Sequence, residues 1–163
     1  MKVAVAIPCY KVKSHILSVI EGIGAEVDTI YVVDDCCPEQ SGNFVIENNQ
    51  DERVKVLWHS ENQGVGGAIV TAYQKALEDD MDIVVKVDGD GQMDPSLLPH
   101  FIEPIIQGRA DYTKGSRFFT LESLTSMPFV RKFGNAALSF INKVSSGYWL
   151  SLIHISEPTR PLH

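Results

Sequence analysis

Strand-like and helix-like segments alternate along most of this chain, and this alternation limits its fold more than any other feature of the sequence. Short apolar runs rich in valine and isoleucine predict strands, and the segments between them have helical spacing. The predicted strands are residues 2–7, 27–33, 53–58, 82–87 and 110–114. The predicted helices are residues 14–24, 42–50, 64–78 and 95–107. This order predicts an α/β fold, Rossmann-like, with a mostly parallel sheet and helices on both of its faces.

Two of the helical segments carry further signals. Asp94 can cap the helix at 95–107, and Pro95 stands at its first position, where a missing N–H costs nothing. Beyond the last predicted strand, apolar residues at 133, 136, 137, 140, 141 and 144 predict an amphipathic helix. Core packing is our first interpretation of that helix, and docking to a membrane or a partner is the alternative.

Composition excludes several classes of protein. A chain of 163 residues suits one domain. The formal net charge of -7 and the isoelectric point near 5.1 argue against a nucleic-acid binder, which would carry a basic surface. The apolar start of the chain is broken by Pro8 too early for a signal peptide, and no apolar run approaches the length of a membrane span. We therefore expect a cytoplasmic location.

The last thirteen residues, 151–163, do not continue the preceding pattern. They closely resemble the translated read-through of a sequencing adapter, so we expect a non-native tail. The expected domain is then residues 1–150, and we expect it to be incomplete at its C-terminal end.

The segment 81–95 holds the most specific motif, because it delivers two carboxylates one residue apart into a glycine loop. Gly89 and Gly91 permit turns that let Asp88, Asp90 and the oxygen of Gln92 face one point. Such oxygen ligands suit Mg²⁺ or Mn²⁺, which take their remaining ligands from water and a substrate phosphate. A solvated Asp-Gly turn is the alternative for an isolated motif. An EF-hand is excluded, because a calcium loop that starts at Asp88 would need glycine at Met93.

Polar residues follow every predicted strand, and the carboxyl ends of parallel strands lie along one edge of a sheet, where ligands bind. We therefore expect these residues to converge: Pro8, Cys9, Tyr10, Asp34, Asp35, His59, Asn62, Gln63, Asp88, Asp90, Gln92, Gly115, Ser116 and Arg117. Asp34 and Asp35 could accept hydrogen bonds from a ribose hydroxyl or a base N–H, although for this pair standing alone an acidic turn that leads to Pro38 is the better explanation.

Other residues are less specific. The glycines at 64, 66 and 67 open a helix and could offer N–H groups to an anion, but they match neither the dinucleotide fingerprint nor a P-loop. Arg117 could pair with a diphosphate, and Arg131 with a second anionic group. The histidines at 15, 59 and 100 have no recognisable partner, and we interpret them as structural. Three cysteines, at 9, 36 and 37, make a poor disulfide framework.

In their order and spacing, these motifs resemble family 2 glycosyltransferases, which have the GT-A fold. The resemblance runs from about residue 2 to 149 and rests on four segments: Ile7-Pro8-Cys9-Tyr10, Val32-Val33-Asp34-Asp35, Asp88-Gly89-Asp90-Gly91-Gln92-Met93-Asp94-Pro95 and Lys114-Gly115-Ser116-Arg117-Phe118. Within the family, the chain is most similar to dolichol- and polyprenyl-phosphate sugar transferases. It departs from the family pattern at Lys11-Val12 and at Cys36-Cys37.

The resemblance implies transfer of a sugar from a nucleoside-diphosphate sugar, with inversion at the anomeric carbon and a polyprenyl (dolichyl-type) phosphate as acceptor. It also implies a division of roles. Asp90 and Arg117 would be catalytic, and Arg131 would hold the acceptor phosphate. Metal ligands would be Asp88, Asp90 and Gln92, with Mg²⁺ or Mn²⁺ as cofactor. The donor would be bound by Pro8, Tyr10, Val33, Asp34, Asp35, Asp88, Gly89 and Arg117.

An acceptor that is already an anion needs no general base, which is compatible with the absence of an obvious base here. On this hypothesis the helix at 133–144 lies toward the cytoplasmic face of a membrane, in peripheral contact with it. Two alternatives stay open. One is an inactive donor-binding fragment, left by truncation. The other is a sugar-nucleotide pyrophosphorylase, which the absence of an early loop rich in glycine, arginine and lysine disfavours.

Overall fold

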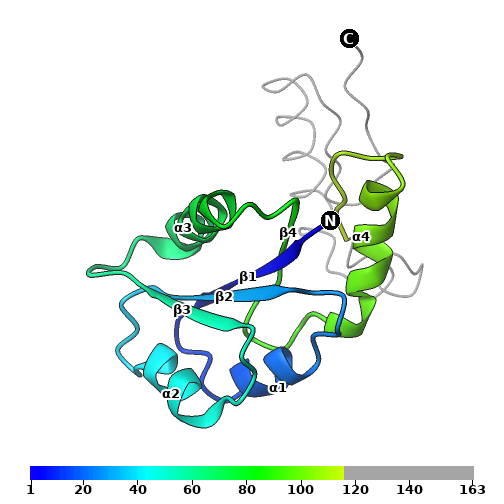
Figure 1. Ribbon diagram of the computed structural model, residues 1–163. Helices are drawn as coiled ribbons and strands as arrows, with labels where there is room; N and C mark the ends of the chain where they lie inside the picture. The colour runs from blue at the N-terminus through cyan, green and yellow to red at the C-terminus, as the bar shows by residue number, and fades with distance from the viewer. Residues whose placement is uncertain (116–163) are drawn as a thin grey trace, which may run out of the picture. The chain divides into compact units, whose positions relative to one another are not determined.

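A computed structural model describes residues 1–115 of the chain. Four parallel strands form one sheet: β1 (Val3–Cys9), β2 (Thr29–Asp34), β3 (Val54–Trp58) and β4 (Ile83–Lys86). Their order in the sheet is β3-β2-β1-β4, so the two earliest strands lie in the middle (Figure 1). The predicted α/β fold with a parallel sheet is confirmed.

Strand pairing aligns the carboxyl ends of the three strands that come first in the chain. Cys9 is opposite Asp34 in the β1–β2 pair, and Asp34 is opposite Trp58 in the β2–β3 pair. On the other side of β1, Ala6 is opposite Lys86. The residues that follow each strand therefore begin at one edge of the sheet, as parallel strands require.

Helices cover both faces of the sheet. Figure 1 shows α3 (Gly64–Glu78) on one face, and α1 (Ile16–Glu21) with α2 (Ser41–Asn48) on the opposite face. On the α3 face, the buried alanines of the helix pack against small side chains of β1; this cluster contains Ala4, Ala6, Tyr31, Val33, Ala68, Ala72 and Ala76. Small residues on both elements let helix and sheet approach closely.

The fourth helical segment begins as predicted. The Asp94 side chain accepts a hydrogen bond from the Ser96 N–H at 3.0 Å, and Pro95 occupies the first position. A 3₁₀ turn, η1 (Pro95–Leu97), leads into α4 (Leu98–Ile106). None of the described helices is both long and apolar enough to cross a membrane.

The predicted fifth strand, residues 110–114, is wrong, because this segment is not a strand in the structure. Its first residue instead closes the end of α4. The Ala110 N–H donates to the Pro104 carbonyl at 3.2 Å, and Gly108 turns the chain there at a φ of 64°. A strand also needs a neighbour to pair with, and β4 pairs only with β1 among the described residues. A short apolar run does not by itself identify a strand.

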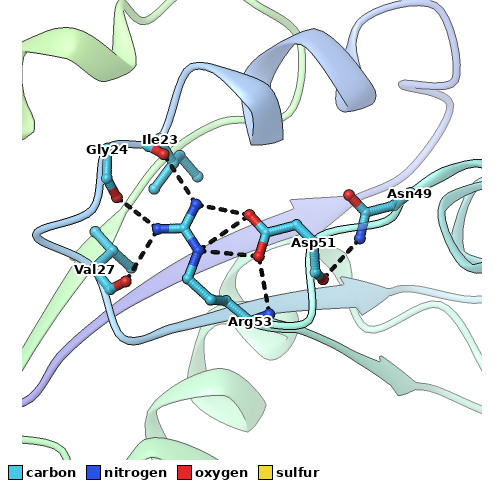
Figure 2. A network of polar contacts seen from close by, with 6 residues as sticks. All are labelled: Ile23, Gly24, Val27, Asn49, Asp51 and Arg53. Carbon is cyan, nitrogen blue, oxygen red and sulfur yellow. Dashed lines mark hydrogen bonds and ion pairs between the residues drawn. The ribbon is translucent and has the colours of Figure 1, made fainter.

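The compact unit that contains the sheet runs from Met1 to Ile102. At the amino edge of its sheet, Arg53 joins the segment before β2 to the segment before β3 (Figure 2). Its guanidinium donates to the carbonyls of Ile23, Gly24 and Val27 and to both carboxylate oxygens of Asp51. The side-chain hydrogen bonds from Arg53 lower the pKa of Asp51. This network fixes two loops with a single side chain.

Candidate functional site

A cavity of about 210 Å³ opens at the carboxyl edge of the sheet. It is lined by residues from the ends of β1 and β4, from the residue after β2 and from the first turns of α3: Pro8, Cys9, Tyr10, Val12, Asp35, Val65, Ala68, Asp88, Gly89 and Asp90. Of the donor and metal residues predicted above, Pro8, Tyr10, Asp35, Asp88, Gly89 and Asp90 therefore lie together. Val33, Asp34 and Gln92 do not line the cavity. Ser116, Arg117, Arg131 and the helix at 133–144 lie outside the described residues.

The side chains of Asp34 and Asp35 point to different faces because side chains alternate along a strand. Tyr31 and Val33 belong to the α3 cluster, so Asp35 shares their parity and faces the cavity. Asp34 is out of phase with them. Its Oδ1 accepts from the Cys37 N–H at 2.7 Å, and its Oδ2 accepts from the Gly42 N–H at 2.6 Å. Asp34 therefore anchors the loop and the first turn of α2.

Asp35 is buried at the cavity wall, with 3% of its surface exposed. Its Oδ1 lies 2.7 Å from Nδ1 of His59 and accepts the Gln63 N–H at 2.8 Å. Burial alone would raise the pKa of Asp35, but the hydrogen bonds from Gln63, His59 and the Gly64 N–H outweigh it and lower the pKa. Asp35 is therefore a carboxylate at neutral pH and offers the cavity a hydrogen-bond acceptor.

His59 was interpreted as structural from the sequence, but it contacts a residue of the cavity wall. Its side chain is 5% exposed, and its two ring nitrogens lie between Asp35 and Thr71. The signal that could have found this contact was its place: His59 directly follows β3 and so shares an edge with Asp35, which directly follows β2.

Asp88 and Asp90 line the cavity from the loop after β4. Lys86 lies 2.7 Å from Oδ1 of Asp88 through its ammonium group. The Gln92 N–H donates to Oδ1 of Asp90 at 3.0 Å, so Gln92 holds that carboxylate through its backbone. Both carboxylates are thus oriented by groups close to them in the sequence: the end of β4 for Asp88 and the loop itself for Asp90.

The two glycines of this loop serve different purposes. Gly91 has a φ of 75°, which permits the turn that was predicted from the sequence. Gly89 has no positive φ; a Cβ there would lie 3.2 Å from side-chain atoms of Ile7, Val12 and Ile16. Gly89 is therefore required for close packing of the loop against the residues around β1 rather than for a left-handed turn.

The carboxylates of Asp88 and Asp90 provide some, but not all, of the oxygen ligands that a hard cation needs. Two carboxylates border the cavity, and Mg²⁺ or Mn²⁺ often takes one or two carboxylates together with water and substrate phosphates. No group of three or more His, Cys, Asp or Glu side chains that could hold a metal ion occurs within residues 1–115. A cation at Asp88 and Asp90 would therefore depend on a ligand to complete its coordination.

The three cysteines are free thiols. Burial raises the pKa of Cys9 to about 12, with a further increase from the nearby charge of Asp34. The Cys37 sulfur accepts a hydrogen bond from the Lys11 N–H at 3.1 Å, which joins the loop after β1 to the loop after β2. Cys36 is exposed and has a φ of 52°. Cys37 therefore has a structural contact at the position where the chain departs from the family pattern.

Solved structures with a similar fold include S. aureus TarS, in a form spanning residues 1–349 of that protein. The TM-score is 0.57 at 22% identity, with 74% of this chain and 40% of the TarS chain covered. The same TarS form in complex with UDP gives a TM-score of 0.55. These values show a shared fold, the GT-A-like arrangement of a parallel sheet with helices.

Curated relatives share sequence with most of the chain. A UDP-N-acetylglucosamine–dolichyl-phosphate N-acetylglucosaminyltransferase of Methanococcus voltae is 32% identical over 89% of this chain and 63% of its own length. A dolichol-phosphate mannosyltransferase of Pyrococcus furiosus is 28% identical over 89% of this chain and 41% of its own length. An undecaprenyl-phosphate mannosyltransferase of Micrococcus luteus is 30% identical over 72% of this chain and 48% of its own length.

The chain thus spans between about 40% and 63% of the length of these relatives. The model of the family described as glycosyl transferase family 2 matches residues 4–157. This range includes all four strands of the sheet, except Val3 at the start of β1, and all the residues that line the cavity. This match covers far more than half of the chain, and the chain therefore belongs to glycosyl transferase family 2.

Proposed function

We propose that this chain carries the donor-binding part of a metal-dependent, inverting glycosyltransferase that moves a sugar from a nucleoside-diphosphate sugar to a polyprenyl phosphate. The observation that carries the proposal is the cavity itself, where Asp35 from the end of β2 meets Asp88 and Asp90 from the end of β4. Acidic groups at strand ends bind the hydroxyls or N–H groups of nucleotides, and acidic pairs bind the cation that accompanies a diphosphate.

Different residues of the cavity would bind different parts of the donor nucleotide sugar. Asp35 would accept a hydrogen bond from the ribose or the base, while Pro8, Tyr10 and Gly89 would bound the space around the nucleotide. Asp88 and Asp90 would hold Mg²⁺ or Mn²⁺, which supplies positive charge where negative charge grows on the leaving diphosphate. Arg117, outside the described residues, would neutralise the same group.

The acceptor assignment is supported by chemistry and by the relatives. A lipid phosphate is an anion near neutral pH, so its oxygen can attack the anomeric carbon while the bond to the diphosphate breaks, without a general base. The names of the three relatives above include dolichyl, dolichol or undecaprenyl phosphate. On this proposal Arg131 steadies the acceptor phosphate, and the protein works at the cytoplasmic face of a membrane.

Calorimetric titration of the full chain with UDP- and GDP-sugars, with and without Mn²⁺, tests the proposal. We expect binding of one donor that Mn²⁺ strengthens at least about tenfold, because the cation bridges the carboxylates and the diphosphate. A product assay with polyprenyl phosphate then separates a transferase from a donor-binding fragment, which would bind without turnover. Binding of no nucleotide sugar, with or without the cation, would refute the donor-binding proposal.

A further inference from the structure

Three hydrogen-bonded side chains, Asp35, His59 and Thr71, support the wall of the cavity. Nδ1 of His59 lies 2.7 Å from Oδ1 of Asp35, and Nε2 of His59 lies 2.8 Å from Oγ1 of Thr71 in α3. The side chains of His59 and Asp35 are 5% and 4% exposed, so solvent does not compete for the bond between them. These hydrogen bonds link the end of β3 to the end of β2 and to α3, the helix that covers this face.

The proton positions follow from the partners. Asp35 is a carboxylate and only accepts hydrogen bonds, so Nδ1 of His59 carries a hydrogen that it donates to Oδ1. The Thr71 hydroxyl can donate or accept, so it can satisfy Nε2 of a neutral ring. A histidine held at both nitrogens has a fixed ring orientation and a fixed tautomer.

Two of the hydrogen bonds to the Asp35 side chain act on the same oxygen. His59 and the Gln63 N–H both donate to Oδ1, and together they fix the rotation of the carboxylate. A carboxylate has about four lone-pair sites, so acceptor capacity remains for a ligand in the cavity that Asp35 lines. Without His59, only the backbone N–H groups of Gln63 and Gly64 would orient the Asp35 carboxylate.

We propose that His59 is a positioning residue, which holds the Asp35 carboxylate in the orientation that accepts a hydrogen bond from the nucleotide, with Thr71 fixing the imidazole from behind. This assignment rests on the proposed function, because it requires that Asp35 contacts the donor. It gives His59 a role in donor affinity without contact between His59 and the donor.

Matched substitutions separate positioning from bulk. In His59→Asn, the side-chain amide can donate from nearly the position of Nδ1, whereas His59→Leu fills similar space and donates nothing. We expect His59→Leu to weaken binding of UDP or GDP, whichever the wild-type chain binds, by about 10- to 100-fold, the effect of losing a hydrogen bond to a charged group. We expect His59→Asn to stay within about threefold of the wild type. His100→Leu, at an exposed histidine, is the control.

A second measurement does not depend on how the variants fold. The ¹⁵N chemical shifts of the imidazole in the wild-type chain identify which nitrogen carries the hydrogen. We expect a protonated Nδ1 for His59. A hydrogen on Nε2 with a bare Nδ1 would overturn the assignment, because Nδ1 could then not donate to Asp35.

The outcomes distinguish the two proposals. If Asp35→Asn weakens nucleotide binding and His59→Leu does not, the positioning role is wrong and the proposed function stands. Equal losses in His59→Asn and His59→Leu would also contradict the positioning role, since the amide should restore the donor. If the wild-type chain binds neither UDP nor GDP, the proposed function falls and the role of His59 falls with it.

Discussion

The two edges of the sheet both gather charged side chains, but they use them differently. At the amino edge, the guanidinium of Arg53 is bound by three carbonyls and by Asp51 of its own chain (Figure 2). At the carboxyl edge, His59 and the Gln63 N–H share Oδ1 of Asp35, the Gln92 N–H donates to Oδ1 of Asp90, and both carboxylates border an open cavity. The hydrogen-bonding groups of the Arg53 cluster are used within the protein, whereas the carboxylates at the carboxyl edge can still accept hydrogen bonds from a ligand.

Asp34 shows that position at an edge does not decide the role. It ends β2 at the carboxyl edge, next to Asp35, yet its two oxygens accept backbone N–H groups from the following loop and from the first turn of α2. It resembles the Arg53 cluster in this respect. The comparison therefore predicts that substitutions at saturated groups change stability, and that substitutions at groups with spare capacity change binding.

The largest effect is expected from Asp90→Asn. Asparagine keeps the size of the side chain and an oxygen for the Gln92 N–H, but it removes the negative charge that a cation needs. We expect Mn²⁺-dependent affinity for the donor sugar nucleotide to fall at least about 100-fold, with stability almost unchanged. Calorimetry and urea unfolding measure the two quantities. Asp80→Asn, at an exposed turn before β4, is the control. An equal loss of affinity in Asp80→Asn would contradict a specific role of Asp90 in binding the cation.

Arg53→Met should give the opposite pattern. Methionine keeps part of the stem but leaves three carbonyls without the guanidinium and leaves Asp51 with only the backbone N–H of residue 53 as a donor from that position. We expect the free energy of unfolding to fall by about 2–3 kcal/mol, because hydrogen bonds to charged groups and partly buried carbonyls are lost together. Urea unfolding measures this loss. Donor affinity of the folded protein should not change; reduced affinity at unchanged stability would contradict the structural role.

A smaller effect is expected from Lys86→Met. The Lys86 ammonium lies 2.7 Å from Oδ1 of Asp88 and would repel a cation at the same carboxylate. We expect Mn²⁺ affinity to rise by about 3- to 10-fold, since the pair is partly exposed and screening limits the gain. Electron paramagnetic resonance of free Mn²⁺ gives this affinity. Lys75→Met removes the same charge from the Glu78 and Asp79 pairs, and an equal rise there would reduce the effect to net charge.

Much of the fold could be predicted from the sequence because its signals are local. Four of the five predicted strands are present, and the helix at 64–78 has the predicted bounds. Asp94 and Pro95 marked a helix start by capping chemistry that depends on three neighbouring residues. The strand prediction for residues 110–114 failed because a strand depends on a partner elsewhere in the chain, which a short apolar run does not reveal.

The location of the candidate site at the carboxyl edge of the sheet could be predicted, but the separate roles of the residues there could not. The rule for carboxyl ends brought Asp35, Asp88 and Asp90 to one cavity. It could not separate Asp34 from Asp35, because their difference depends on which helix covers which face. The alternation of side chains in β2 would have sorted them once α3 was known to cover the face of Tyr31 and Val33. His59 was expected at this edge, but its contacts were missed because its partners are 24 and 12 residues away.

A crystal structure of the chain with Mn²⁺ and the tightest-binding nucleoside diphosphate tests the central claim most directly. The account predicts an anomalous Mn²⁺ peak within coordination distance of the carboxylates of Asp88 and Asp90, and a nucleotide that donates a hydrogen bond to Asp35. A nucleotide bound on the α2 face, or a cation bound away from both carboxylates, would contradict it.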